Sequence, residues 1–152
     1  MLDPGQKLPA FSLPDQGGKN KSLKDLAGPK GLVLYFYPKD STSGCTLEAQ
    51  EFTALAGLFE KAGFGVAGVS KDSVKSHCTF TAKHGLGIPL LSDADASLIR
   101  AAGAWGEKKM YGKVSAGIVR STLVVDPKGN VLIAYPKVSA RGHAAAVLEN
   151  LP

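Results

Sequence analysis

The sequence has little of the material from which several classes of protein are built. Its 152 residues include only two cysteines, too few for a disulfide scaffold, so each thiol is considered by itself. No apolar run reaches the roughly 18 residues that suggest a membrane span. The first residues pass directly into turn-rich sequence, without a basic and then apolar signal segment. We therefore expect no membrane partner and a cytoplasmic location.

Charge patterns and ligand motifs are equally sparse. The net charge is +5, but the lysines and arginines are scattered and Lys108–Lys109 is the only adjacent pair. Without a basic stripe we expect no nucleic-acid partner. His77, Cys78 and His84 lack a well-placed third ligand, so we expect no metal. No phosphate-binding glycine loop is present, and His143 is expected at the surface.

Apolar periodicity and turn residues predict an alternating α/β chain. The length and the 44% apolar content are typical of one globular domain, here residues 1–152. The predicted elements are a hairpin (11–14 with 19–23), a short helical turn (22–26), a strand (31–37), a helix (43–61), a strand (65–70), a helix (73–83), a short strand (89–92), a short helix (94–101), a hairpin (121–126 with 131–135) and a helix (140–149).

This order predicts a three-layer α/β sandwich of the thioredoxin-like type. Alternating strands and helices require a mostly parallel centre, and the late hairpin adds antiparallel strands to make a mixed sheet. The first hairpin lies ahead of this core. In open sheets of this kind, sites lie at the carboxyl ends of the strands, and Cys45 follows the strand that ends near Tyr37.

Cys45 is the best candidate for chemistry. It stands after Pro38 and a short Ser/Gly loop, where the predicted helix begins. The thiolate is the reactive form of cysteine, and a helix N-terminus favours negative charge. The N–H groups of Gly44 and Cys45 are available donors if the helix starts here. The alternative is an inert, half-buried cysteine that fills the core.

The neighbouring residues complete a candidate site. The Thr42 hydroxyl can reach the sulfur or a substrate across one turn, and Pro38 can shield the pocket from water. Lys39 is a flexible cation, whereas Arg120, which precedes a predicted strand, offers a rigid guanidinium fork. The alternative is that Thr42 is only a helix cap.

At this point the chain resembles a known family, the peroxiredoxins. The pattern Pro38-x-x-x-Thr42-x-x-Cys45 matches their active-site signature, and the surrounding residues look like the peroxiredoxin Q branch, also called bacterioferritin comigratory protein. Further matches lie at residues 35–40, 45–49, 68–73, 90–93, 105–112 and 117–122. The resemblance therefore covers nearly the whole chain.

The resemblance implies a thiol peroxidase that needs no bound cofactor. Cys45 would attack the peroxide and become a sulfenic acid. Thr42 and Arg120 would bind the peroxide oxygens while Pro38 shields the sulfur. Glu48 matches a family position that orients the arginine; without the family, it could be a solvated acid of the first helical turn.

The second cysteine, Cys78, has two alternative roles. One family arrangement places the resolving cysteine five residues after the first, which here is Gln50. Another places it in the next helix, at a position that matches Thr81, three residues beyond Cys78. Residues three apart on a helix differ by about 60° in direction, so Cys78 is expected to face broadly the same way and to form a disulfide with Cys45 after local unfolding. The alternative is a one-cysteine mechanism completed by an external thiol.

Three functions remain open from the sequence. The favoured one is a hydroperoxide reductase recycled by thioredoxin or by a glutaredoxin or glutathione type of donor, and the family branch suggests a monomer or weak dimer. A thioredoxin-like dithiol oxidoreductase is disfavoured because Cys-x-x-Cys is missing: position 42 is Thr and position 48 is Glu. A catalytically inactive interaction module is the third.

Overall fold

A computed structural model describes residues 1–110 and 112–152 of the chain; Tyr111, part of the 105–112 match, lies outside the described residues. Its elements are β1 (Ser12–Pro14), β2 (Asn20–Ser22), α1 (Leu23–Leu26), β3 (Gly31–Phe36), α2 (Ser43–Lys61), β4 (Phe64–Ser70), α3 (Val74–His84), β5 (Leu90–Ser92), α4 (Ser97–Ala101), β6 (Trp105–Met110), β7 (Lys113–Ile118), β8 (Ser121–Val125), β9 (Val131–Tyr135) and α5 (His143–Glu149).

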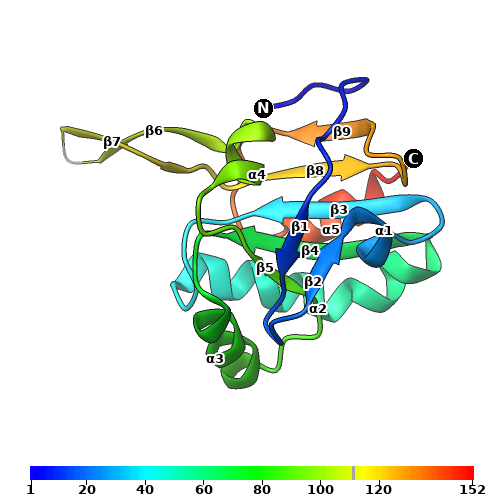
Figure 1. Ribbon diagram of the computed structural model, residues 1–152, viewed down its shortest axis with the longest axis horizontal. Helices are drawn as coiled ribbons and strands as arrows, with labels where there is room; N and C mark the ends of the chain where they lie inside the picture. Colours follow the sequence, from blue (N-terminus) through cyan, green and yellow to red (C-terminus); the bar gives the residue numbers. More distant parts are fainter. Residues whose placement is uncertain (111) are drawn as a thin grey trace.

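The centre of the molecule is a mixed five-stranded sheet in the order β5-β4-β3-β8-β9 (Figure 1). β3 pairs parallel with β4 and antiparallel with β8, and β4 pairs parallel with β5. β8 and β9 form the antiparallel hairpin that the turn at 127–130 predicts. The predicted three-layer sandwich with a mixed sheet and an N-terminal β1–β2 hairpin is confirmed.

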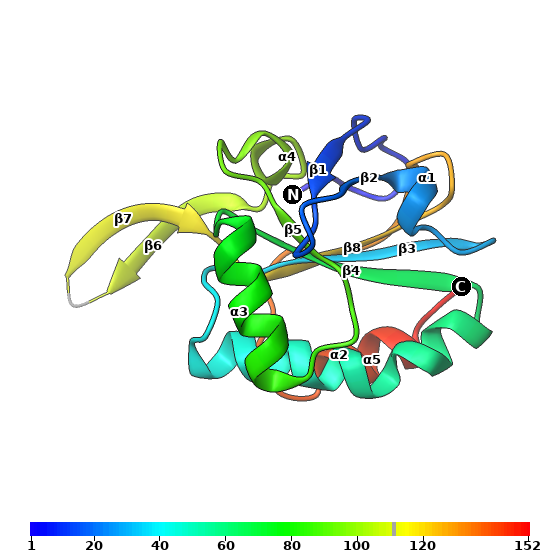
Figure 2. The same ribbon diagram turned by 60° about the horizontal axis from the view of Figure 1, so that its bottom comes forward.

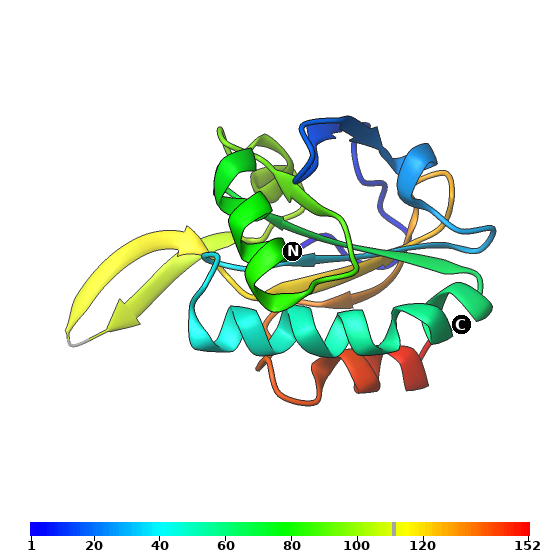
Figure 3. The same cartoon turned by 90° about the horizontal axis from the view of Figure 1, so that it is seen from below.

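β3 is buried on both faces and divides the core in two. Leu32, Leu34 and Phe36 point into a cluster shared with α4 and the N-terminal segment. Val33 and Tyr35 point to the other side, into a cluster with α2 and α5. Figures 2 and 3 show α2 and α5 together on one face of the sheet, with β1, β2, α1 and α4 on the other. This burial on both faces explains why the strand reads as one continuous apolar run.

α2 has the predicted bounds, Ser43 to Lys61. Its buried residues recur on one face at helical spacing: Cys45, Glu48, Ala49, Phe52 and Phe59. Phe52 stacks on Tyr35 of β3 with ring centroids 4.6 Å apart. Since α2 is anchored along the sheet in this way, its first turn is held at the end of β3, where the active-site signature lies.

The sequence reading missed one element, the antiparallel hairpin β6–β7. It projects away from the three layers (Figure 1). Most of β7 is exposed, including Val114 at 58% exposure. Both strands contain many charged or small residues, so they lack the apolar alternation by which half-buried strands are recognised.

Among the residues that the structure describes, we find no helix with the length and hydropathy needed to cross a membrane.

Candidate active site

The candidate site lies where β3 ends and α2 begins. Thr42 is the N-cap of α2, so Cys45 falls in the first turn of the helix. The amide N–H groups of a first turn have no acceptor within the helix and present partial positive charge. Cys45 is only 1% exposed, which places its thiol under the surface of the site.

Arg120 places a positively charged guanidinium beside Cys45, as expected from the sequence. It immediately precedes β8, which pairs with β3, so the sheet sets its position. Its Nη2 donates to Cys45 Sγ at 3.3 Å and its Nη1 to Glu48 Oε1 at 2.7 Å. One guanidinium fork therefore joins two residues of α2 that are one turn apart.

Gly44 makes room for this fork. A Cβ atom at Gly44 would lie 3.1 Å from Arg120 Nη2, tighter than an ordinary contact. Any larger side chain would have to move the guanidinium away from Cys45. Glycine at this position is therefore explained by the close approach of Arg120.

Glu48 is fully buried, at 0% exposure, so the alternative of a solvated first-turn acid is wrong. Burial raises its pKa to about 7, although the positive charge of Arg120 acts in the opposite direction. Its second oxygen, Oε2, is buried without a hydrogen-bond partner in the described structure. Glu48 therefore holds Arg120 through a single oxygen.

Thr42 and Pro38 border the site on the loop before α2. Thr42 is exposed, and its hydroxyl donates to the carbonyl oxygen of Lys39 at 2.9 Å. Thr42 is thus the N-cap of α2 by position, but its hydroxyl makes no hydrogen bond to the helix. Pro38 is half-buried directly after β3. With the donor of Thr42 already used, only its oxygen lone pairs remain free for a substrate.

Cys78 has the opposite surroundings to Cys45. It lies in α3 and is exposed, whereas the hydroxyl oxygen of Thr81 is buried without a partner in the described structure. The two neighbouring positions of α3 therefore differ in exposure. The rotation of about 60° between them is enough to carry Cys78 from the interface to the surface.

His143 is also placed differently from the expectation. It is buried at the start of α5, and its Nε2 lies 2.7 Å from the Thr122 hydroxyl. Burial lowers its pKa to about 4, and the charge of Arg120 adds to this. The expectation of a surface histidine is wrong because the partner of His143 is 21 residues away in sequence, on β8.

The sequence reading also missed a cluster of polar residues beside the site. Asp40, Asp72 and His77 bring possible metal-ligand atoms within 4.8 Å of one another. The carboxylate of Asp40 already accepts bonds from Tyr37 Oη at 2.6 Å and Ser76 Oγ at 2.8 Å. A cation would have to displace these donors. The only sequence signal was the buried strand end at Tyr37 followed closely by an acidic residue.

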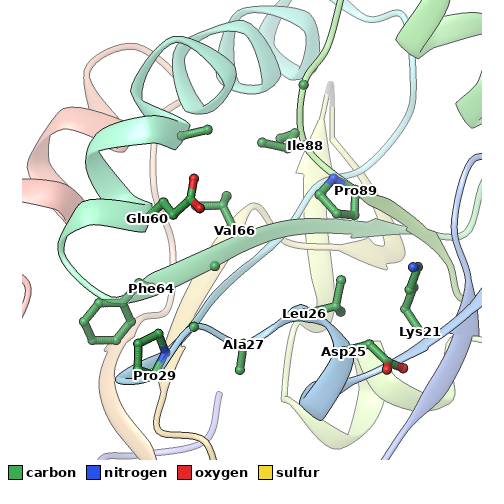
Figure 4. Close-up of a pocket in the computed structure, with 14 residues that line it drawn as sticks. Lys21, Asp25, Leu26, Ala27, Pro29, Glu60, Phe64, Val66, Ile88 and Pro89 are labelled. Atoms are coloured by element: carbon green, nitrogen blue, oxygen red, sulfur yellow. The ribbon is translucent and has the colours of Figure 1, made fainter.

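The described structure also has a hollow away from this site. A cavity of about 400 Å³ is lined by α1, the start of β4 and the C-terminal part of α2 (Figure 4). Glu60 borders it, and at about 1.5 Å per residue Glu60 lies roughly 22 Å along α2 from Cys45. The candidate site and this hollow are thus at opposite ends of α2.

A thioredoxin-like sheet with a buried cysteine at a helix N-terminus, bonded to an arginine, defines a thiol peroxidase of the peroxiredoxin class. The sequence pattern of the AhpC/TSA family matches residues 4–133. The chain belongs to this family. Within it the chain is a peroxiredoxin of the Bcp/PrxQ type, and hence an enzyme.

The relatives support this assignment along nearly the whole chain. Peroxiredoxin Bcp of Xanthomonas campestris is 51% identical over 155 residues, which cover 99% of this chain and 96% of that protein. A putative peroxiredoxin of Mycobacterium tuberculosis is 47% identical over 150 residues, covering 99% of this chain and 95% of that protein.

Solved structures agree with the fold. The bacterioferritin comigratory protein of X. campestris, studied for its alkyl peroxide reduction activity, superposes with a TM-score of 0.87 at 49% identity, covering 97% of this chain and 96% of that one. A cysteine-to-serine mutant of PrxQ from Xylella fastidiosa gives a TM-score of 0.89 at 41% identity, covering 98% and 94%.

Proposed function

We propose that Cys45 is the peroxidatic cysteine of a hydroperoxide reductase that acts on hydrogen peroxide and organic hydroperoxides. The observation that carries the proposal is the 3.3 Å bond from Arg120 Nη2 to Cys45 Sγ at the N-terminus of α2. The alkyl peroxide reduction of the X. campestris protein supports organic substrates.

In this proposal, Arg120 and the N-terminus of α2 are the positive groups that would stabilise the thiolate form of Cys45 during the attack. Two opposite charges about 4 Å apart interact by about 4 kcal/mol at an effective dielectric constant near 20, before desolvation is subtracted. The helix N-terminus adds roughly 0.3–1 kcal/mol. Arg120 is only 17% exposed, so water screens this attraction less than at an open surface.

In the first step, the thiolate attacks the terminal oxygen of the hydroperoxide. The S–O bond forms as the O–O bond breaks, so Cys45 is oxidised to sulfenic acid and the peroxide is reduced to an alkoxide, or to hydroxide from hydrogen peroxide. A proton taken from solvent makes the leaving group an alcohol or water. Arg120 stabilises the negative charge as it moves from sulfur to oxygen.

Thr42 and Pro38 complete the peroxide site in this proposal. The Thr42 hydroxyl donates its hydrogen bond to Lys39 O, so its lone pairs can accept a hydrogen bond from the O–H of an incoming hydroperoxide. That bond would direct the terminal oxygen toward Cys45. Half-buried Pro38 limits the access of water, and Glu48 fixes Arg120 through its 2.7 Å bond.

For the second step, we propose that Cys78 resolves the sulfenic acid. The Cys78 thiol would displace water from Cys45-SOH, forming an intramolecular disulfide that thioredoxin, or a glutaredoxin or glutathione type of donor, reduces with two electrons. Cys78 is the only other thiol of the chain. Because Cys45 is buried and Cys78 is exposed, the two helices must separate locally. The chain would act as a monomer or weak dimer in the cytoplasm.

The peroxidase proposal is tested by stopped-flow peroxide consumption with dithiothreitol as reductant, comparing the intact protein with Cys45→Ser. We expect activity to be lost in the variant, because no other sulfur of the chain is bonded to a guanidinium in the described structure. Equal rates in the two proteins would end the proposal.

The resolving step is tested separately by mass spectrometry after one equivalent of peroxide. A peptide joining Cys45 to Cys78 is expected. Cys45 carrying glutathione or further oxygens, with no such link, would instead assign a one-cysteine mechanism.

A further inference from the structure

A buried polar network joins the loop before α2 to the N-terminal part of α3. Asp40, in the loop, accepts bonds through its carboxylate from Tyr37, Ser76 and His77. Its backbone N–H donates to Asp72 Oδ2 at 2.9 Å, and Ser70 Oγ donates to the same oxygen at 2.6 Å. The loop is therefore tied both to α3 and to the end of β4.

His77 is the member of this network that comes from the buried face of α3. Its Nδ1 lies 2.7 Å from Asp40 Oδ2 and its Nε2 lies 3.0 Å from the carbonyl oxygen of Leu91. His77 thus bridges the Asp40 carboxylate and the Leu91 carbonyl oxygen, one through each ring nitrogen. The His77 and Asp40 side chains are only 0% and 2% exposed, so this contact is shielded from water.

The Asp40 carboxylate is suited to this role. Burial by itself raises its pKa, but the hydrogen bonds from His77, Tyr37 and Ser76 outweigh burial and bring the pKa below its ordinary value. The next residue, Ser41, has a left-handed backbone conformation with φ of 64°, which costs a non-glycine residue roughly 1–2 kcal/mol. The loop thus keeps a strained shape that needs external contacts to hold it.

The Asp40–His77 bond connects the segments that would carry out the two proposed steps, attack on peroxide and resolution by Cys78. Asp40 lies between Pro38 and Thr42, which border the peroxide site. Ser76 and His77 directly precede Cys78 in α3. We propose that Asp40 and His77 are positioning residues that fasten α3 to the catalytic loop, so that release of Cys78 and distortion of the peroxide site are a single event.

The consequence is an ordered cycle, and this part rests on the proposed resolving role of Cys78. While the bond is intact, the loop keeps the geometry that receives peroxide and Cys78 stays on the outer face of α3. When the bond opens, α3 can leave and Cys78 can reach the sulfenic acid. The same opening relaxes the loop, which disfavours attack by a second peroxide on Cys45.

Two substitutions of His77 distinguish the loss of its bond to Asp40 from other effects of changing this residue. His77→Asn keeps a donor near the position of Nδ1, facing Asp40. His77→Gln keeps a donor near the position of Nε2, facing Leu91 O, and loses the bond to Asp40. A hydrogen bond to a charged group contributes enough for roughly a 10- to 100-fold change in an equilibrium.

We expect His77→Gln to change three rates relative to His77→Asn. Hydrogen exchange of the amides of α3 should be at least about 10-fold faster, formation of sulfenic acid should be slower, and the disulfide step should be faster. Ser76→Ala, which removes one neutral donor to Asp40, should change them in the same directions by less, and decides the question if a His77 variant does not fold.

A matched control excludes general loosening. Val147→Ala removes buried side-chain volume from α5, in the core cluster that also contains Tyr37 and Phe80. It is expected to lower stability without changing a residue of the polar network around Asp40. The inference is overturned if exchange in α3 is equal in the two His77 variants, or rises only in step with the whole chain as in Val147→Ala.

The outcome for the resolving role is read separately. If the intact protein never links Cys45 to Cys78, that role fails. The exchange of α3 and the rate of sulfenic acid formation still decide whether Asp40 and His77 position the loop.

Discussion

Cys45 and Cys78 lie on consecutive helices, and their surroundings are opposite. Cys45 is 1% exposed, sits in the first turn of α2 and is bonded to Arg120. Cys78 is exposed, within the length of α3. Access alone would make Cys78 the reactive thiol. Under the proposed function it is instead charge that makes Cys45 the reactive one, because the thiolate is the nucleophile and positive neighbours favour it. The comparison teaches that exposure and electrostatic surroundings point to different thiols, so an experiment can separate them.

The largest expected effect comes from changing Arg120, the cation that distinguishes the surroundings of Cys45 from those of Cys78. Arg120→Lys keeps a cation but loses the fork that reaches Cys45 and Glu48 together. We expect the rate of sulfenic acid formation to fall by roughly 100-fold, as for the loss of one preorganised donor in a catalytic site. Rapid-mixing measurements of peroxide reduction check this, with Arg120→Met as the variant lacking both charge and fork. Wild-type rates in Arg120→Lys would remove Arg120 from the site.

The next effect exchanges the position of the second thiol. Thr81→Cys in a Cys78→Ser background places a thiol where the Thr81 hydroxyl is buried, at the position matching the family's resolving cysteine. We expect this double variant to form an intramolecular disulfide that Cys78→Ser alone does not form. Non-reducing mass spectrometry after peroxide treatment distinguishes them. No link to residue 81 would show that the buried face of α3 does not approach Cys45.

A third effect concerns the buried acid behind the site. Burial raises the pKa of Glu48 from its ordinary 4.5 to about 7, so the folded protein binds a proton that the unfolded chain has released. The stabilisation is therefore fully present below pH 4.5 and is lost as pH rises through 7, by up to about 3 kcal/mol. Urea unfolding across this range should show the loss in the intact protein relative to Glu48→Gln.

His143 acts in the opposite direction over part of that range. Burial lowers its pKa to about 4, so its contribution is present above about pH 6.5 and is lost as pH falls through 4. The intact protein alone can therefore show little net slope between these values. The difference between the intact protein and Glu48→Gln isolates Glu48, and a difference that does not change with pH would contradict the assignment.

The smallest effect tests the room left for the guanidinium. Gly44→Ala places a Cβ 3.1 Å from Arg120 Nη2 and should move the fork by a few tenths of an ångström. We expect the rate of peroxide reduction to fall by roughly three- to tenfold. Alanine should at the same time raise the free energy of unfolding by up to about 1 kcal/mol, because it favours the helix more than glycine does. Stopped-flow rates with parallel urea unfolding check both. A loss of stability that accompanies the loss of rate would indicate a general distortion instead.

Much of this arrangement could be predicted from the sequence because it depends on local patterns. The apolar spacing within α2 and the unbroken apolar run of β3 predicted the bounds of both elements to within a residue. The position of Cys45 after Pro38 and before the helix is a property of the same short segment. Arg120 could be predicted as a site residue because it directly precedes a strand with a clear apolar pattern.

The remainder depends on contacts between distant residues. His77 meets Asp40 across 37 positions and His143 meets Thr122 across 21. A histidine in a helix has no local feature that separates a buried partner from a surface position. The exposure of Cys78 likewise follows from how α3 is rotated on the sheet, which His77 and Phe80 decide by being buried.

The most direct test of the central claim compares the two thiols in single-thiol variants. Cys78→Ser keeps only Cys45 and Cys45→Ser keeps only Cys78, so neither variant can form the intramolecular disulfide that would oxidise both thiols of the intact protein. Each reduced variant is mixed with less than one equivalent of hydrogen peroxide at pH 6, quenched at set times, and the rate of oxidation of its cysteine is measured by mass spectrometry under denaturing conditions. We expect the buried Cys45 to be oxidised far faster than Cys78, and this preference to be lost when Cys78→Ser also carries Arg120→Met. Oxidation of exposed Cys78 at an equal or greater rate would contradict the claim that buried charge makes Cys45 the reactive thiol.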